Sequence, residues 1–330
     1  MIGLFGHEGD DAADAGGQAG KERQPERDPE RTDFHDFHSL SQKRGKPRAD
    51  DLRIRLSLGR GWGKNQEVKV LLVGVDLAWG EKKHDGLCFL EWNGKRGRVA
   101  GFAYPQGDQE LLAAIRGKEK TWKSVFVAVD APLVCPNQTG TRPVDRLTHR
   151  MFHREHAACH PANLTKCPRP PRIARLLEKE GFRVGWEPTA EKKTVAEVYP
   201  HPAMVRMFGL PRIVKYKKGS VVERRREFRR LQRLLKQCLG NKFPRLAVDA
   251  DTRSLLTRPW SKPVEDRTDA FFCALIGLWH WMYRGTRSEV IGDRETGFIL
   301  LPKAGRLKER MALQSLRPRA QRDRQHGVTC

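Results

Sequence analysis

Two short apolar segments, VKVLLVGVD at 68–76 and SVFVAVD at 124–130, decide the fold that this sequence encodes. Each is an almost continuous run of apolar residues, which is typical of a strand buried on both faces of a sheet. Each ends in an aspartate, and open α/β sheets bind their ligands at the carboxyl ends of the strands. We therefore expect both segments to be central strands, with Asp76 and Asp130 at one edge of the sheet.

Further strands and helices are predicted on both sides of these segments. The Asn93-Gly94 pair between two apolar runs is a strong signal for a β-hairpin. Strands are expected at 87–92, 98–104, 194–199, 290–291 and 298–301, and helices at 109–115, 172–180, within 212–242 and at 265–283. This succession of strands and helices is typical of a mixed α/β layer architecture.

The chain of 330 residues separates into three parts by composition. Residues 1–66 hold 12 basic and 12 acidic residues without a sustained apolar period, so we predict a disordered extension. An over-long gene start would explain the same segment. Residues 305–330 form a basic tail with a net charge of +5. One folded domain is therefore expected at 67–304, and it carries +18 of the total charge of +23.

The positive charge of the predicted domain is concentrated in one segment. Residues 212–242 contain 12 basic and two acidic residues, and their apolar residues fall on one helical stripe. A basic excess of this kind is typical of proteins that bind polyanions, although a solubilising surface has the same composition. The arginines expected to face outward and to contact nucleic acid are Arg225, Arg226, Arg229 and Arg233.

Composition excludes two classes of protein. No run reaches the roughly 18 apolar residues that a membrane span needs. Seven cysteines in 330 residues do not form the disulfide framework of a small secreted scaffold. The first residues are acidic and lack the apolar core of a secretory leader. We therefore expect a soluble cytoplasmic protein without a membrane partner.

Besides Asp76 and Asp130, three further acids stand where burial is expected. Glu197 lies inside the apolar strand TVAEVYP, and Asp266 and Asp269 lie three apart on one face of the last predicted helix. A buried carboxylate must become protonated, pair with a base or bind a cation. Turn formation, helix capping and salt bridges to arginine each explain single members of the set. As a cluster, the carboxylates suit Mg²⁺ or Mn²⁺, and two such ions can drive phosphodiester cleavage.

Two other groups of polar residues follow the second central strand. Arg142 and Asp145 stand three apart, where they either orient a phosphate or pair with each other. Four histidines fall at helical spacing beside two cysteines, and a zinc ion would accept a subset of these side chains. That subset is His153, His156, Cys159 and Cys167. Because its spacing fits no standard zinc pattern, a polar surface helix that also carries His149 and His160 is the alternative interpretation.

Six motifs resemble one known family. They are GVDLAW at 74–79, VDAPL at 129–133, TRPVDRLTHR at 141–150, EVYPHPA at 197–203, EDRTDAFFCALIG at 265–277 and IGD…TGFILLP at 291–302. In this order they are similar to the domain-of-unknown-function 429 family, which is described as predicted nucleases of the ribonuclease H-like fold. The resemblance implies an α/β fold with a mixed five-stranded sheet, flanking helices, helical insertions and a C-terminal hairpin. It also implies that the first strand lies beside the strand that ends at Asp130.

The same resemblance implies a site. The step from Asp266 to Asp269 is similar to the last acidic motif of Holliday-junction resolvases on this fold. By that likeness Asp76, Asp130, Asp266 and Asp269 are candidate catalytic residues, and Glu197 is a further one. The expected ligands of Mg²⁺ or Mn²⁺ are Asp76, Asp130 and Asp269.

The sequence therefore favours a divalent-metal-dependent nuclease that acts on DNA or RNA. Two alternatives stay open, because a fold does not determine a function. A nucleic-acid-binding protein with an inactive site has the same basic surface and predicts binding that chelators do not affect. A phosphotransferase of the actin-like or sugar-kinase type also begins with a strand-ending aspartate, but this sequence lacks a second glycine-rich phosphate loop.

Overall fold

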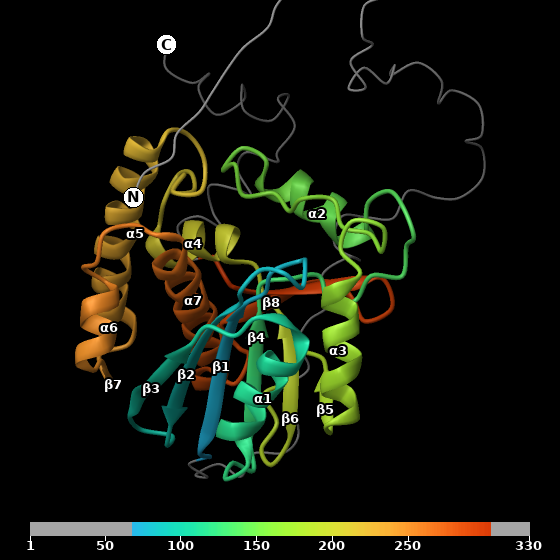
Figure 1. Cartoon of the computed structure of the whole chain (residues 1–330), viewed down its shortest axis with the longest axis horizontal. Coiled ribbons are helices and arrows are strands. Elements are labelled where there is room, and N and C mark those ends of the chain that lie inside the picture. The colour runs from blue at the N-terminus through green and yellow to red at the C-terminus, as the bar shows by residue number, and fades with distance from the viewer. Residues whose placement is uncertain (1–67, 305–330) are drawn as a thin grey trace, which may run out of the picture. The chain divides into compact units, whose positions relative to one another are not determined.

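The structure, a computed structural model, describes residues 68–304 (Figure 1). Seven strands in this part of the chain form one sheet. They are β1 (Val70–Asp76), β2 (Gly86–Trp92), β3 (Gly97–Ala103), β4 (Val125–Val129), β5 (Phe182–Val184), β6 (Lys193–Glu197) and β7 (Leu246–Ala247). Their spatial order is β5-β6-β4-β1-β2-β3-β7. The extension predicted at 1–66 and the tail predicted at 305–330 lie outside the described residues.

The sheet is mixed. β1 pairs in parallel with β4, and β4 with β6, while β2 runs antiparallel between β1 and β3. The prediction that the first strand lies beside the strand that ends before Asp130 is thus confirmed. The expected number of five strands is wrong, because β5 and β7 each add a short strand at an edge. With three and two residues, these edge strands are too short to produce an apolar pattern in the sequence.

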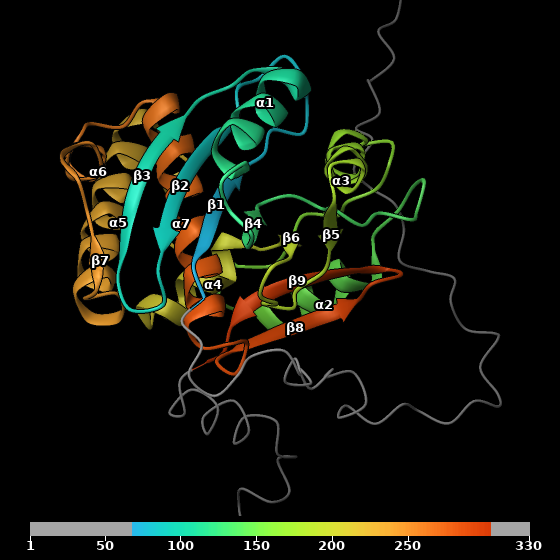
Figure 2. The ribbon, with the colours of Figure 1, turned by 90° about the horizontal axis from the view of Figure 1, so that it is seen from below.

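Helices cover both faces of the sheet (Figure 2). They are α1 (Gly107–Glu119), α2 (Pro143–Phe152), α3 (Arg169–Lys179), α4 (Pro200–Phe208), α5 (Val221–Lys242), α6 (Ala250–Leu255) and α7 (Lys262–Met282). One face is packed by α1 and α3, whose apolar residues meet Leu71, Val73 and Val75 of β1. The opposite face is packed by α7, and Leu72 of β1 belongs to that second core. Alternate residues of β1 therefore enter two separate apolar cores, as its uninterrupted apolar sequence predicts.

The four predicted helices are present as α1, α3, α5 and α7. The short helices α2 and α4 begin at Pro143 and Pro200, and α4 and α6 were not predicted. A proline fits the first turn of a helix as well as the end of a strand, so the one at position 200 does not reveal the helix that follows. Among residues 68–304, no helix has the length and the apolar content needed to cross a bilayer.

The predicted C-terminal hairpin is confirmed as β8 (Ser288–Asp293) and β9 (Gly297–Pro302). Its apolar residues belong to the core on the α7 side of the sheet. A parallel bridge between Val198 and Leu300 joins the hairpin to the chain just after β6. The hairpin therefore continues the layer of α7 alongside the β6 end of the sheet (Figure 2).

Candidate functional site

Asp76 and Asp130 lie side by side at the carboxyl ends of two central strands. Asp76 is the last residue of β1, and Asp130 follows β4 directly. The N–H of Asp130 donates to the carbonyl of Val75 at 2.9 Å, which continues the parallel register of the two strands. Side chains at such neighbouring positions project to the same side of a sheet. That side is the one covered by α7, since Gly74, two residues before Asp76, contacts this helix.

The helix α7 brings a third carboxylate to the same edge. A Cβ at Gly74 would stand only 2.0 Å from the carbonyl oxygen of Ala270, so the helix backbone touches the strand backbone. Asp269 immediately precedes this contact and is 1% exposed. Its negative charge raises the pKa of both Asp76 and Asp130, and it stands next to the contact between α7 and β1. We call these three residues the acidic centre.

Two residues of the loop between α4 and α5 bind the acidic centre. The hydroxyl of Tyr216 donates to Oδ1 of Asp269 at 2.6 Å. The ammonium of Lys217 lies 2.7 Å from Oδ2 of the same carboxylate. Both are absent from the sequence prediction, because nothing in the segment KYKKGS distinguishes these two residues from their basic neighbours.

The protonation of the acidic centre is governed by burial and by Lys217. Burial raises the pKa of Asp76 well above its usual range, against the opposing charge of Lys217. Burial raises the pKa of Asp130 to about 7, again against Lys217. Burial also raises the pKa of Asp269, although Lys217 and the Tyr216 hydroxyl counteract it. For Lys217 itself, attraction to Asp269 and its neighbours outweighs burial and raises the pKa well above the usual value. Three carboxylates thus share one ammonium.

Asp266 lies at the margin of the acidic centre. Its Oδ2 accepts a hydrogen bond from the hydroxyl of Tyr104 at 2.8 Å. Its Oδ1 lies 2.7 Å from the ammonium of Lys262, four residues earlier in α7. Both oxygens are therefore engaged, and the carboxylate acts on Asp76 only as the weakest of the neighbouring charges that raise its pKa.

Glu197 points away from the acidic centre. It stands in register with Val129, which packs against α1 and α3. Its side chain therefore leaves the sheet on the face of α1 and α3, whereas the acidic centre lies on the face of α7. Its two oxygens bind the guanidinium of Arg142 at 2.7 and 2.9 Å, and it also accepts the N–H of Leu133. Arg142 also binds Asp145, through Nη2, which it shares with Glu197, at 2.8 Å and through Nε at 3.2 Å. Of the five acids expected from the sequence, Glu197 and Asp266 are thus bound by other partners, although the charge of Glu197 still raises the pKa of Asp130.

Arg142 is buried by these contacts. Its side chain is 2% exposed, and its two carboxylate partners are exposed by 1% and 5%. Of the two roles open to Arg142 and Asp145, the structure thus selects pairing with each other. The prediction that Arg142 contacts nucleic acid requires correction, since its guanidinium is enclosed by Asp145 of α2, Glu197 of β6 and the carbonyl of Val134. The pairing ties α2 to β6 instead.

The predicted basic surface is present on α5. Its buried stripe consists of Phe228, Leu231, Gln232, Leu235 and Cys238. On the outer side, the exposed arginines include the four that were predicted to contact nucleic acid, Arg225, Arg226, Arg229 and Arg233. A capping box between Ser220 and Glu223 fixes the start of this helix, three residues after Lys217.

The histidines and cysteines after α2 do not share a helix. α2 ends at Phe152, and His156 has a φ of 57°, which is incompatible with a continuing helix. The thiol of Cys167 is buried and donates to the carbonyl of Asn163 at 3.1 Å. The prediction that His149, His153, His156 and His160 share one helical face is therefore wrong, although His149 and His153 stack on each other at the end of α2.

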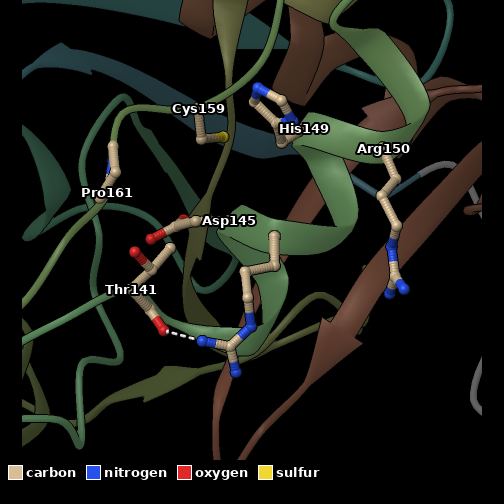
Figure 3. A pocket seen from close by; sticks show the side chains of 7 residues that line it. Thr141, Asp145, His149, Arg150, Cys159 and Pro161 are labelled. Carbon is tan, nitrogen blue, oxygen red and sulfur yellow. Dashed lines mark hydrogen bonds between the residues drawn. The ribbon is translucent and has the colours of Figure 1, made fainter. Parts of the chain in front are cut away.

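A pocket of about 430 Å³ opens beside α2 (Figure 3). It is lined by Thr141, Asp145, Arg146, His149, Arg150, Cys159 and Pro161. Figure 3 shows the Cys159 thiol directed toward His149. Arg146 donates a hydrogen bond to the Thr141 carbonyl at 2.6 Å. Both α2 and the loop before α5 stand at the end of the sheet where β1 and β4 terminate (Figure 1). The pocket therefore belongs to the same end of the molecule as the acidic centre.

The acidic centre fits one divalent cation at Asp76 and Asp130. Among residues 68–304 no hydrogen bond to either carboxylate is present, and both residues are half-buried. Mg²⁺ is commonly held by one or two carboxylates, with water and substrate phosphate completing its shell. In the described part of the chain no three His, Cys, Asp or Glu side chains gather as one metal-binding group. Asp269 already forms an ion pair with Lys217, so we do not count it among the ligands of this cation.

A comparison with known families matches residues 74–296 to the family described as "Protein of unknown function (DUF429)". The chain belongs to this family. The part matched to DUF429 includes Asp76, Asp130, Lys217 and Asp269, and so contains the whole acidic centre with its lysine. Comparisons with curated proteins and with solved structures gave no significant match.

Proposed function

We propose that this protein is a divalent-metal-dependent nuclease that hydrolyses phosphodiester bonds of DNA or RNA at the acidic centre. The observation that carries the proposal is the pair Asp76 and Asp130, whose carboxylates lie on adjacent strands and receive no hydrogen bond from residues 68–304. Two neighbouring half-buried carboxylates without donors are unfavourable unless a proton or a cation compensates them. Mg²⁺ or Mn²⁺ satisfies that requirement with hard oxygen ligands.

The fold supports the same proposal. The five long strands β3, β2, β1, β4 and β6 form a mixed sheet with β1 beside β4, which agrees with the ribonuclease H-like arrangement that the sequence motifs imply. The acids lie at the carboxyl end of the parallel strands, where open α/β sheets handle their ligands. The outward arginines of α5 would hold the polyanion by its phosphates.

In this function each residue of the site has a separate task. Asp76 and Asp130 would hold the metal ion, which supplies an activated water and neutralises charge on the phosphate. Asp269 positions Lys217, and Tyr216 fixes the orientation of the Asp269 carboxylate through the 2.6 Å hydrogen bond. The side chain of Lys217 keeps 33% of its surface exposed, so its ammonium can also reach a bound phosphate.

The test is cleavage of labelled single-stranded, duplex, hybrid and branched nucleic acids in Mg²⁺ or Mn²⁺. The matched variants are Asp76→Asn and Asp251→Asn, since Asp251 is exposed on α6. We expect cleavage by the wild type and by Asp251→Asn, and a loss of at least about 100-fold in Asp76→Asn, because removing a metal-bound carboxylate removes much of the charge stabilisation. Absence of cleavage on every substrate, or full activity in Asp76→Asn, contradicts the proposal.

One observation favours a second candidate, a nucleic-acid-binding protein without catalysis. Lys217 already neutralises part of the acidic centre, and a site balanced in this way needs less of a metal ion. This candidate predicts that EDTA leaves nucleic-acid binding unchanged and that the log of the affinity falls linearly with the log of the salt concentration. Loss of binding in EDTA argues for the nuclease instead.

A further inference from the structure

We propose that Lys217 serves as the second cation of the acidic centre, so that the centre binds one divalent ion where two-metal nucleases bind two. The inference rests on the proposed function, because it concerns the metal ions of the same site. It assigns Asp76 and Asp130 to the ion and Asp269 to the lysine.

The contacts of the three carboxylates divide them in this way. Asp269 is 2% exposed in its side chain, and its oxygens meet Tyr216 at 2.6 Å and Lys217 at 2.7 Å. Asp76 and Asp130 accept no hydrogen bond from the described part of the chain. A metal ion would therefore find two carboxylates without hydrogen-bond donors, Asp76 and Asp130, and a third one, Asp269, that Lys217 and Tyr216 already bind.

Charge balance supports one ion. When a metal ion displaces the protons of the centre, its three carboxylates carry three negative charges, and Lys217 brings one positive charge that acts on all of them. A single divalent ion would complete neutrality. A second divalent ion would bring a large positive excess into a half-buried site, which is costly because charges interact strongly where water is scarce.

Lys217 is held in place by its neighbour in the chain. Tyr216 is buried, and its ring lies 6.1 Å from the ring of Phe228 in the buried stripe of α5. The Tyr216 hydroxyl is bound to Asp269, so the loop is fixed between α5 and α7. A lysine on a loop anchored in this manner is preorganised, as a tightly bound cation would be.

The partly exposed side of Lys217 gives the ammonium a function that a purely structural ion pair lacks. In two-metal sites the ions stand about 3.5–4 Å apart and stabilise the attacking and the leaving oxygen of the phosphate. Lys217 lies beside the acidic centre and keeps 33% of its side chain exposed. The single ion would hold the phosphate, and the ammonium of Lys217 would contact this phosphate from the position that a second metal ion has in two-metal sites.

The experiment is a Mn²⁺ titration of the full chain by isothermal calorimetry, with electron paramagnetic resonance to detect coupling between neighbouring Mn²⁺ ions. The variants are Lys217→Met, which keeps the length and removes the charge, and Lys218→Met, the adjacent exposed lysine, as the matched control. We expect one Mn²⁺ in the wild type and in Lys218→Met. We expect two coupled Mn²⁺ ions in Lys217→Met, or at least a tenfold tighter first ion.

Each other result overturns the inference. Two ions in the wild type mean that Lys217 does not occupy a cation place, and no bound Mn²⁺ means that the centre is not a metal site. Equal stoichiometry and affinity in Lys217→Met and the wild type mean that the lysine does not compete for the carboxylates. If Lys217→Met does not fold, the wild-type stoichiometry decides. One bound ion without cleavage of any nucleic acid would refute the proposed function and leave this inference intact.

Discussion

Gly74 of β1 and Ala270 of α7 are in backbone contact. A Cβ on Gly74 would stand 2.0 Å from the carbonyl oxygen of Ala270 and 2.3 Å from the amide nitrogen of Ala274. Real Cβ atoms essentially never approach backbone atoms this closely, so only glycine allows the helix to lie at this depth. Because Asp269 precedes Ala270 directly, the same contact sets the distance between the third carboxylate and the sheet.

We predict that Gly74→Ala destabilises the protein by about 3 kcal/mol, at the upper end of the usual cost of overpacking, because a backbone carbonyl cannot yield as a side chain does. The helix must move away from β1, so the Tyr216–Asp269 hydrogen bond should be disturbed as well. Urea unfolding gives the change in the free energy of unfolding.

The matched control for this prediction is Gly117→Ala. Gly117 lies in α1, and a Cβ there meets nothing within 4 Å. Alanine is favoured over glycine inside a helix by about 0.5–1 kcal/mol, so this variant should be slightly more stable than the wild type. If both variants unfold at the same urea concentration, close backbone contact does not limit the position of α7.

The stability of the protein should also depend on pH through His280. This histidine of α7 is fully buried, and its Nε2 faces the carbonyl of Trp186. Burial lowers its pKa to about 4, although the hydrogen bond to Trp186 opposes the shift. The unfolded chain takes up this proton near pH 6.5 and the folded protein does not, so the contribution is fully present above that pH and is lost on acidification. Between pH 7 and pH 4 it amounts to about 3 kcal/mol.

The measurement is the free energy of unfolding at several pH values in the wild type and in His280→Gln. We expect the wild type to lose more stability than the variant on acidification, whatever the other titrating groups contribute. His153→Gln, at an exposed position, is the control and should follow the wild type. Parallel curves for the wild type and His280→Gln would show that burial of this imidazole does not depress its pKa.

The basic face of α5 gives a prediction about salt. Arg225, Arg229 and Arg233 are exposed and stand four residues apart on one side of the helix. Replacing all three by glutamine should weaken binding of a 20-base-pair duplex and reduce the slope of log affinity against log salt by about 3, since each lost phosphate contact removes about one unit. Fluorescence anisotropy in EDTA measures this separately from any metal-dependent step.

A second triple variant controls for the loss of net charge. It replaces the exposed residues Lys120, Arg175 and Lys179, which lie on or next to α1 and α3 on the opposite face of the sheet. We expect the salt slope of this variant to match that of the wild type. If both triple variants change the slope equally, nucleic acid responds to total charge and α5 is not the contact surface.

Much of this architecture is predictable because it depends on local sequence. Continuous apolar runs reveal β1 and β4, and the residues that end them, Asp76 and Asp130, must then lie at one edge. Residues paired through long-range contacts are not predictable in this way. Glu197 meets Arg142 across 55 residues, and Asp269 meets Tyr216 across 53. The partner of a buried acid depends on the face of the sheet from which its side chain projects and on which distant loop packs against that face. Neither can be predicted from the local sequence.

Exposed Trp79 should stack on a base of a bound single strand. It follows Asp76 by three residues and is 38% exposed, and hydrogen bonds hold its neighbour Ala78. The N–H of Ala78 donates to Asp85 at 2.8 Å, and Arg169 donates to the Ala78 carbonyl at 2.7 Å. An exposed aromatic ring three residues after Asp76 suits base stacking, which contributes about 1–3 kcal/mol per base.

We therefore expect Trp79→Ala to weaken binding of a single-stranded oligonucleotide by about 5- to 150-fold, the range that corresponds to that stacking energy. Trp79→Phe keeps an aromatic ring and should recover most of the affinity. Met151→Ala is the matched control, because Met151 of α2 is 39% exposed and its truncation removes apolar surface without an aromatic ring. Equal affinity of Trp79→Ala and Met151→Ala, measured by fluorescence anisotropy, would mean that Trp79 lies outside the path of the strand.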